Sequence, residues 1–188
     1  MKKNIIILIV VIVVLSFTWK KYGSKIKEKT LEFLNLGIRE TGGNNVNFNN
    51  EEFKKKMKEA GWSSGASWCM FFAKMVYENV YPDLKSDFRK SLGGSTQASW
   101  KNVKNGKSDS LKIVTSGPAQ VGDIVIWQNY DNPAFGHAGI VTKVKGNKYE
   151  STEGNTSSGI HTIEHDLKYG KRDNYHKGKK LLGFIRRK

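Results

Sequence analysis

The spacing of the apolar residues changes once along this chain, and that change limits the possible folds more than any other feature. Up to about residue 104 the spacing is helical. Its most regular example is a stripe at positions i, i+3, i+4, i+7, i+8 and i+12, formed by Trp68, Phe71, Phe72, Met75, Val76 and Val80. From residue 111 onward, short segments, several of them β-branched, alternate with Gly, Pro and Asn turns. Helices followed by strands predict an α+β domain, with N-terminal helices packed on a central antiparallel β-sheet of about five to six strands.

Local signals place the elements of this domain. Three side chains are expected to cap helices: Asn49, in a capping box with Glu52, Ser67 just before the apolar stripe, and Ser95 ahead of a short helix. A further helix is expected over 30–39. The expected strands are 111–115, 123–128, 137–144, 148–152, 160–164 and 182–186.

The first 19 residues differ from the rest of the chain. Lys2 and Lys3 precede an unbroken apolar run, and the segment has the basic start and short apolar core of an export signal. As a helix, residues 4–19 would be about 24 Å long, somewhat short for a hydrocarbon core of about 30 Å. We expect residues 1–19 to form an uncleaved signal anchor, with a cleaved signal as the alternative, residues 20–29 a basic linker, and residues 30–188 the folded domain.

The lysines around this segment conflict with export. Five of them follow the apolar run between residues 20 and 29, against two before it, and the positive-inside rule then favours an inside location for the bulk of the chain. The very short N-terminal tail favours the opposite orientation. The expected location is the cell membrane, crossed once, with the domain on the outer or periplasmic side. The alternative is secretion after signal cleavage.

Net charge is the outlying feature of the composition. The 188 residues include 32 Lys and Arg against 17 Asp and Glu, a net charge of +15. Such a charge predicts an acidic partner, whether nucleic acid, an anionic membrane surface or an anionic polymer. Nucleic acid is not expected as a partner, because the basic residues are scattered or gather in the tail and form no recognisable reading motif.

Cys69 is the chain's one cysteine, so no internal disulfide and no zinc site of several cysteines can form. Behind the expected Ser67 cap, its thiol lies at about the second helical position, where free backbone N–H groups and the helix dipole lower a thiol pKa. It lies one position off the apolar stripe, whereas a structural cysteine would more naturally occupy the stripe. A buried, inert thiol is the alternative, because free cysteine is among the most buried residue types.

A thiolate nucleophile needs a general base, and the chain has four histidines. His137 opens a strand directly after a loop and has glycines nearby, so its side chain can face a cleft; an exposed turn histidine is the alternative. His161 and His165 would lie roughly 13 Å apart on a strand, too far for a shared metal ion, and are expected on a solvated face. His176 lies in a basic loop and is expected at the surface.

The strand after the histidine strand ends in Glu153-Gly154-Asn155. Consecutive strands of a meander run antiparallel, so the end of this strand lies near the start of the one that carries His137. Glu153 and Asn155, two apart on one face, are then the candidates to orient the second ring nitrogen of the histidine. A plain hairpin turn is the alternative for Gly154-Asn155.

These residues lie in motifs that resemble those of the CHAP domain, a family of cysteine, histidine-dependent amidohydrolases and peptidases. Residues 65–72 (GASWCMFF) resemble the family's W-C-x-x-F helix, and residues 121–127 (VGDIVIW) its G-D-[IV]-x-x-[FW] strand. Residues 136–141 (GHAGIV) resemble its histidine strand, and residues 153–155 (EGN) the E-x-N element of phage endolysin members. The motifs follow the family's order, and the resemblance covers about residues 30–186.

The resemblance implies a papain-like α+β fold and hydrolysis of amide bonds in peptidoglycan, as an N-acetylmuramoyl-L-alanine amidase or an endopeptidase. It implies Cys69 as the nucleophile, His137 as the base, Glu153 as the orienting carboxylate and Asn155 as a further polar partner. The backbone N–H of Cys69 would contribute to the oxyanion hole. Certain phage members carry a calcium loop of aspartates before the cysteine, but residues 61–68 contain no carboxylate, so no metal and no cofactor is expected.

Three functions stay open at this point. The first is a peptidoglycan hydrolase kept near the wall by its charge and its N-terminal segment. The second keeps the fold and the thiol chemistry but acts on a protein substrate. The third is a catalytically inactive, basic binding module for cell-wall polymer, in which Cys69 would have the pKa of an ordinary thiol.

Overall fold

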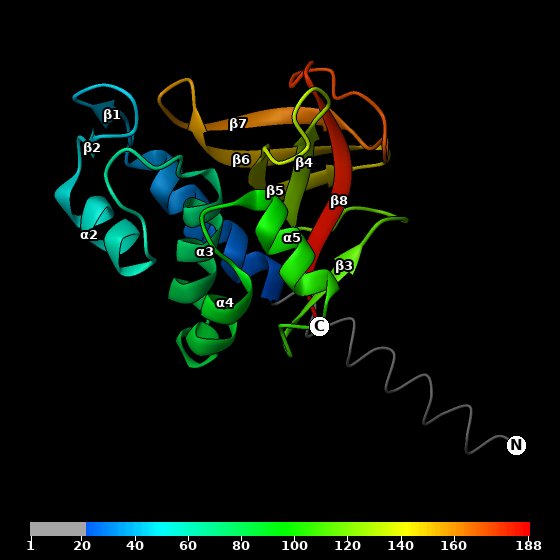
Figure 1. The fold of residues 1–188 in the computed structure, drawn as a ribbon, viewed down its shortest axis with the longest axis horizontal. Coiled ribbons are helices and arrows are strands. Elements are labelled where there is room, and N and C mark those ends of the chain that lie inside the picture. The colour runs from blue at the N-terminus through cyan, green and yellow to red at the C-terminus, as the bar shows by residue number, and fades with distance from the viewer. Residues whose placement is uncertain (1–21) are drawn as a thin grey trace, which may run out of the picture.

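In the computed structural model, which describes residues 22–188, helices form one layer and an antiparallel sheet the other (Figure 1). The helices are a first one over 22–35, α2 (Glu51–Glu59), α3 (Cys69–Val80), the short 3-10 helix η1 (Pro82–Leu84), α4 (Lys85–Ser91) and α5 (Thr96–Lys104). The strands are β1 (Glu40–Thr41), β2 (Asn47–Phe48), β3 (Leu111–Val114), β4 (Ile124–Asn129), β5 (Gly136–Lys145), β6 (Lys148–Thr156), β7 (Gly159–Asp166) and β8 (Lys179–Arg187). The predicted α+β architecture is confirmed.

The main sheet has six strands in the order β3-β8-β4-β5-β6-β7, and all its neighbouring strands run antiparallel. Strands β4 to β7 form the predicted meander. The last strand departs from it, because β8 returns to lie between β3 and β4 (Figure 1). The pair β1 and β2 forms a separate two-stranded sheet that the sequence analysis did not predict.

Helix α3 is buried on nearly every side. It packs on β5 and β6, and α2 and α4 lie against it as well (Figure 1). The apolar stripe predicts only the face toward the sheet. Under the neighbouring helices, Lys74 and Glu78 are 7% and 4% exposed and form an ion pair of 3.7 Å, while the Lys74 ammonium also donates to the Ala60 carbonyl at 2.8 Å. These contacts compensate the two buried charges.

Two of the three predicted helix caps differ from the structure. Ser95 caps α5 as predicted, its hydroxyl accepting from the Ala98 N–H. Helix α2 is capped by Asn50, one residue after the predicted Asn49. Helix α3 starts after Trp68 and has no side-chain cap, so the Ser67 prediction is wrong and the cysteine is the first helical residue.

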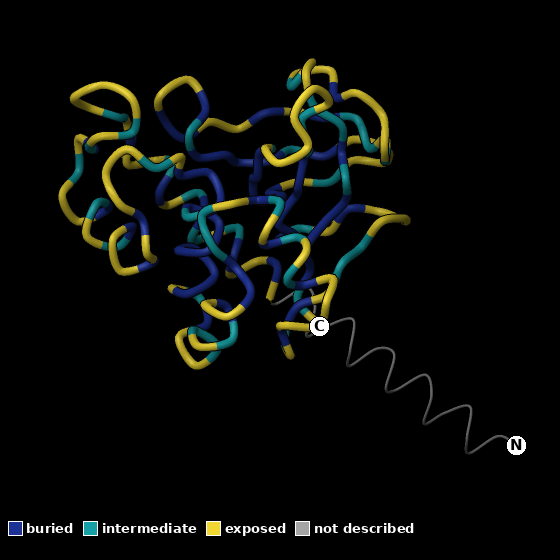
Figure 2. Tube along the Cα trace, in the orientation of Figure 1, coloured by how far each residue is buried: buried dark blue, intermediate teal, exposed yellow. Residues whose placement is uncertain are grey.

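The sheet buries apolar side chains on both faces. Along β4, Ile124 and Ile126 face the helix layer, whereas Val125 and Trp127 belong to a second cluster on the far face. Figure 2 shows the central strands and α3 as the most buried part of the chain. The run of apolar residues in β4 is what burial on both faces requires. Both faces therefore fix the position of β4, and with it that of β5 and its histidine.

The predicted single-pass location in the cell membrane is contradicted: over residues 22–188, no helix is both long enough and apolar enough to cross a bilayer. The segment predicted as the anchor, 1–19, lies outside the described residues. Within the predicted linker, 20–29, the residues from 22 onward are helical. Ile26 in this part is 2% exposed and joins the main core, so these residues pack with the domain.

Candidate active site

Cys69 is buried, with 5% of its surface exposed, at the first position of α3. The first backbone N–H groups of a helix have no partners within it. The N–H of Met70 is one of these, and it donates to the Cys69 sulfur, as does the N–H of Ala138 from β5. The chain therefore surrounds the sulfur with groups that stabilise a negative charge.

His137, the second residue of β5, lies across from Trp127 of β4 and is 7% exposed. Its Nε2 atom is 2.9 Å from Glu153 Oε2 and 3.1 Å from the Thr156 hydroxyl. Its side chain also hydrogen-bonds to Cys69. Because Nε2 is engaged by Glu153 and Thr156, Nδ1 is the nitrogen left for the thiol.

The pKa values of Cys69 and His137 shift toward an ion pair. Burial alone would raise the pKa of the Cys69 thiol, but the charge and hydrogen bond of His137 and two backbone N–H groups lower it. Burial alone would lower the pKa of His137, but Cys69 and Glu153 raise it to about 10. Each shift favours the charged form of the group, so the pair is held as thiolate and imidazolium.

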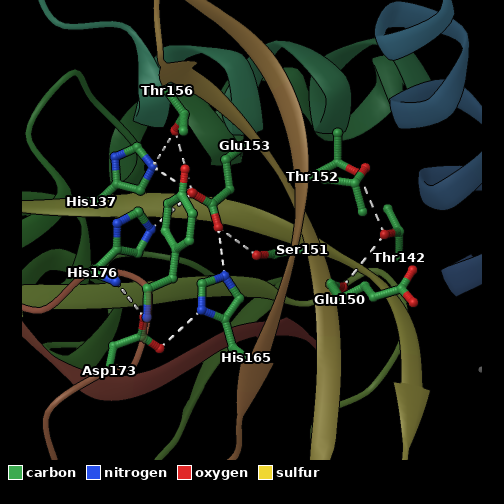
Figure 3. Close-up of polar contacts among 12 residues, drawn as sticks. His137, Thr142, Glu150, Ser151, Thr152, Glu153, Thr156, His165, Asp173 and His176 are labelled. Atoms are coloured by element: carbon green, nitrogen blue, oxygen red, sulfur yellow. Dashed lines mark hydrogen bonds and ion pairs between the residues drawn. The ribbon is translucent and has the colours of Figure 1, made fainter.

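Glu153 has no exposed surface and lies in the middle of three histidine rings (Figure 3). Its position needs a glycine on the neighbouring strand, since a Cβ atom on Gly139 would lie 2.6 Å from Glu153 Cγ. A side chain at that position would push the carboxylate out of place. The fold thus fixes Glu153 both through its polar partners and through the space left beside it.

Four side chains contact the Glu153 carboxylate at normal hydrogen-bond distances. The rings of His137 and His176 each approach Oε2 at 2.9 Å, and His165 approaches Oε1 at 2.9 Å. The Ser151 hydroxyl donates to Oε1 at 2.6 Å. Burial alone would raise the pKa of Glu153, but the three histidines lower it well below its usual value. The carboxylate therefore stays ionised and accepts all of these bonds.

His165 lies between two carboxylates. Its Nε2 is 2.9 Å from Glu153 Oε1 and its Nδ1 is 2.9 Å from Asp173 Oδ2. Since an ionised carboxylate only accepts, both ring nitrogens donate and the ring is an imidazolium. Burial would lower the pKa of His165, but the two carboxylates raise it to about 9. Charges then alternate along the row Cys69, His137, Glu153, His165 and Asp173.

His176 belongs to the loop before β8 and is fixed through its backbone. Its N–H donates to Asp173 Oδ1 at 2.7 Å, while its Nε2 contacts Glu153. Burial is the main reason that the pKa of His176 is lowered, and the two neighbouring histidines add to it. The buried Trp127 ring lies 4.8 to 5.9 Å, between ring centroids, from all three histidines and packs against the cluster.

The family model of the CHAP domain matches residues 61–155. The chain belongs to the CHAP domain family. No curated protein and no solved structure matches the chain. Membership of the CHAP family implies cysteine- and histidine-dependent amidohydrolase or peptidase activity, of the peptidoglycan-hydrolase type in general.

The matched CHAP span contains three of the predicted site residues that the structure brings together: Cys69, His137 and Glu153. It also contains Asn155, whose backbone has φ 60° and whose side chain is half-buried. Among the described contacts, Asn155 has no hydrogen bond to Cys69 or His137. The sequence analysis did not identify Thr156, which contacts His137 instead.

Two predictions about the remaining histidines of this CHAP chain are wrong. His165 and His176 were expected at the surface, but His165 is 1% exposed and His176 is half-buried. His161 is exposed, as predicted. A signal for His165 lies in the strand register, because β7 pairs it with Tyr149 and so places its ring on the face of β6 that carries Glu153. No local pattern marks the loop residues Asp173 and His176.

Proposed function

We propose that this chain is a peptidoglycan hydrolase that cleaves an amide bond of the stem peptide or cross-bridge, with Cys69 as nucleophile, His137 as general base and Glu153 as the carboxylate that orients the base. The observation that carries the proposal is the buried contact between Cys69 and a His137 ring whose other nitrogen Glu153 holds at 2.9 Å. A nucleophile, a base in reach of it and a third group that orients the base are the parts that acyl transfer requires.

The first half of the reaction forms a thioester. The Cys69 thiolate attacks the carbonyl carbon, and the backbone N–H of Cys69 at the start of α3 stabilises the oxyanion. The C–N bond then breaks, and the His137 imidazolium gives its Nδ1 proton to the leaving amine. The acyl group stays on the sulfur, and His137 is neutral.

The second half releases the acyl product. His137 takes a proton from a water molecule, whose oxygen attacks the thioester carbon. The C–S bond breaks, Cys69 leaves as the thiolate, and His137 is again the imidazolium. Throughout both steps Glu153 keeps Nε2 of the ring protonated and its plane fixed, which is the work of an orienting carboxylate.

The net charge of +15 supports a wall substrate. Cell envelopes are rich in anionic polymers, and an excess of Lys and Arg raises the local concentration of the protein near them. The net charge increases the affinity for the wall, whereas the active site determines which amide bond is cleaved.

Mass spectrometry of the muropeptides released from purified sacculi tests the proposal. Wild type should release fragments, and Cys69→Ala should release none, while the exposed-site variant His161→Ala should match wild type. A Cys69→Ala protein that clears walls at the wild-type rate would sink the proposal. New peptide amino termini on free stem peptides indicate an amidase, and cuts within the stem or bridge indicate an endopeptidase. Cleavage of casein without muropeptide release would instead favour a protein substrate.

A further inference from the structure

The ring of His176 has no task in the proposed hydrolysis. Its Nε2 lies 2.9 Å from Glu153 Oε2, the same oxygen that lies 2.9 Å from His137 Nε2. Orienting a base histidine takes one carboxylate and no second ring. Two imidazole nitrogens next to one buried carboxylate oxygen form an arrangement that catalysis alone does not explain.

We propose that His137, Glu153 and His176 bind one zinc ion. One donor atom from each residue, two ring nitrogens and a carboxylate oxygen, can be chosen so that all three lie within 4.8 Å of one another. Zinc ligands at about 2.0–2.2 Å in a tetrahedron are separated by roughly 3.3 Å. Small rotations of these side chains therefore bring the three donors onto one ion.

The chemistry of the donors selects the metal. Two imidazole nitrogens and one carboxylate oxygen are the ligands of three-residue zinc sites that keep a fourth position for water. Calcium and magnesium prefer sets made of oxygen ligands alone. The Thr156 hydroxyl lies beside two of these donors, 3.1 Å from His137 Nε2 and 3.4 Å from Glu153 Oε2, and can bond to a water on the ion.

The surrounding contacts hold the donors in place before any ion arrives. The free oxygen of Glu153 is fixed by Ser151 at 2.6 Å and by His165 at 2.9 Å. His176 is held by the bond from its backbone N–H to Asp173. Outer contacts of this kind orient metal ligands and contribute to affinity. The side chains of His137 and His176 are each 9% exposed, so the donors are shielded but in contact with solvent.

An effect on hydrolysis follows, and this consequence rests on the proposed function. To bind zinc through Nε2, His137 must give up the proton on that nitrogen, and Glu153 must turn from the ring to the ion. The ring then can no longer carry protons on both nitrogens, so the imidazolium partner of the Cys69 thiolate is lost. Zinc should inhibit the enzyme, and a chelator should restore it.

Calorimetric titration of the untagged full chain with zinc chloride tests the site directly. Wild type should bind one ion per chain, and His176→Gln should bind at least about tenfold more weakly, since it removes a ligand. His161→Gln, which changes an exposed histidine on β7, should bind as wild type does. Circular dichroism and thermal unfolding without zinc establish that each variant is folded.

Cys69→Ser separates this site from the other zinc site that a cysteine and a histidine can form. Cys69→Ser should still bind one zinc ion per chain, because the thiol is not a ligand. The proposal is overturned if wild type binds no zinc, or if Cys69→Ser abolishes binding while His176→Gln retains it.

Wall hydrolysis with and without zinc tests the consequence separately. Zinc should slow wild type and EDTA should reverse this, while the same zinc concentration should leave the rate of His176→Gln at the level that this variant has without zinc. A wild type that hydrolyses no wall would refute the proposed function, and the calorimetry would still decide the metal site.

Discussion

The ion pair between Cys69 and His137 makes the thiol the most direct probe of the site. Replacing His137 with alanine removes the charge and hydrogen bond that lower the pKa of Cys69. Burial of the thiol remains, and burial raises that pKa. We therefore expect the thiol of His137→Ala to ionise at a higher pH than an ordinary cysteine, and the wild-type thiol at a lower one.

The size of the effect follows from the ionised fraction. An ordinary thiol with a pKa of about 8.5 is about 3% ionised at pH 7, so complete ionisation increases the thiolate population about 30-fold. Part of this gain is lost because a thiolate of low pKa is a weaker nucleophile. In the variant, burial reduces the ionised fraction below that of the ordinary thiol. The alkylation rate at pH 7 should therefore fall by about tenfold or more in His137→Ala.

The assay is the rate of iodoacetamide alkylation of the single thiol between pH 5 and pH 11. The wild-type rate should reach a plateau that lasts until His137 loses its proton, at a pKa of about 10. The rate for His137→Ala should climb through the alkaline range without that plateau, and the control His161→Ala should follow wild type. Identical profiles for wild type and His137→Ala, both with a midpoint near 8.5, would refute the ion pair.

Three further predictions concern the groups around the site. The pKa of His165 is raised from 6.5 to about 9, so its contribution to stability is complete below about pH 6.5 and is lost as the pH rises through about 9. In thermal unfolding, the variant His165→Gln should therefore lose less stability than wild type over that pH range. An equal loss in both proteins contradicts this prediction. Arg186→Met removes the two contacts of 2.7 Å that Arg186 makes with the buried Asp123 carboxylate. The free energy of unfolding in urea should fall by about 3–5 kcal/mol, and adding Asp123→Asn should recover most of this loss. A loss below about 1 kcal/mol contradicts a buried pair. Gly139→Ala puts a Cβ atom 2.6 Å from Glu153 Cγ. Because the carboxylate is displaced, hydrolysis should slow by up to about 100-fold without unfolding of the chain. An unchanged rate shows that Glu153 can move freely.

The order of the longer helices and of the six strands of the main sheet could be predicted because its signals are local. The stripe on α3 and the turns between β4, β5, β6 and β7 depend on neighbours in sequence. The place of β8 could not, since its insertion between β3 and β4 depends on pairing with strands far along the chain. The same limit applies to α3, where Lys74 and Glu78 look exposed in sequence and are buried under α2 and α4.

The approach of His137 and Glu153 could be predicted for a geometric reason, whereas the place of Cys69 beside them was implied by the resemblance to the CHAP family. Consecutive antiparallel strands bring the end of β6 to the start of β5, whatever side chains they carry. The one-residue error in the start of α3 leaves Cys69 in the first turn of the helix, as predicted.

The burial of His165 and His176 could not be predicted in the same way. A histidine in a polar stretch is ordinarily solvated, and these two are buried because Glu153 and Asp173 offer carboxylates inside the fold. Asp173 and His176 come from a loop, and the conformation of that loop depends on the site it covers. Their positions depend on tertiary structure and cannot be predicted from the periodicity of the sequence.

The charges of this buried cluster explain why a further cation is favourable there. Its hydrogen bonds require His165 to be an imidazolium, and the shared proton of Cys69 and His137 leaves a thiolate beside a second imidazolium. Counting Cys69, Glu153 and Asp173 as anions against two imidazolium cations gives 3 − 2, an excess of one negative charge, in a chain whose net charge is +15. An uncompensated buried charge is costly. A zinc ion removes the excess, because it adds two positive charges and displaces one proton from His137. Protons and zinc should therefore compete for the Nε2 atom of His137, and zinc affinity should weaken as the pH falls.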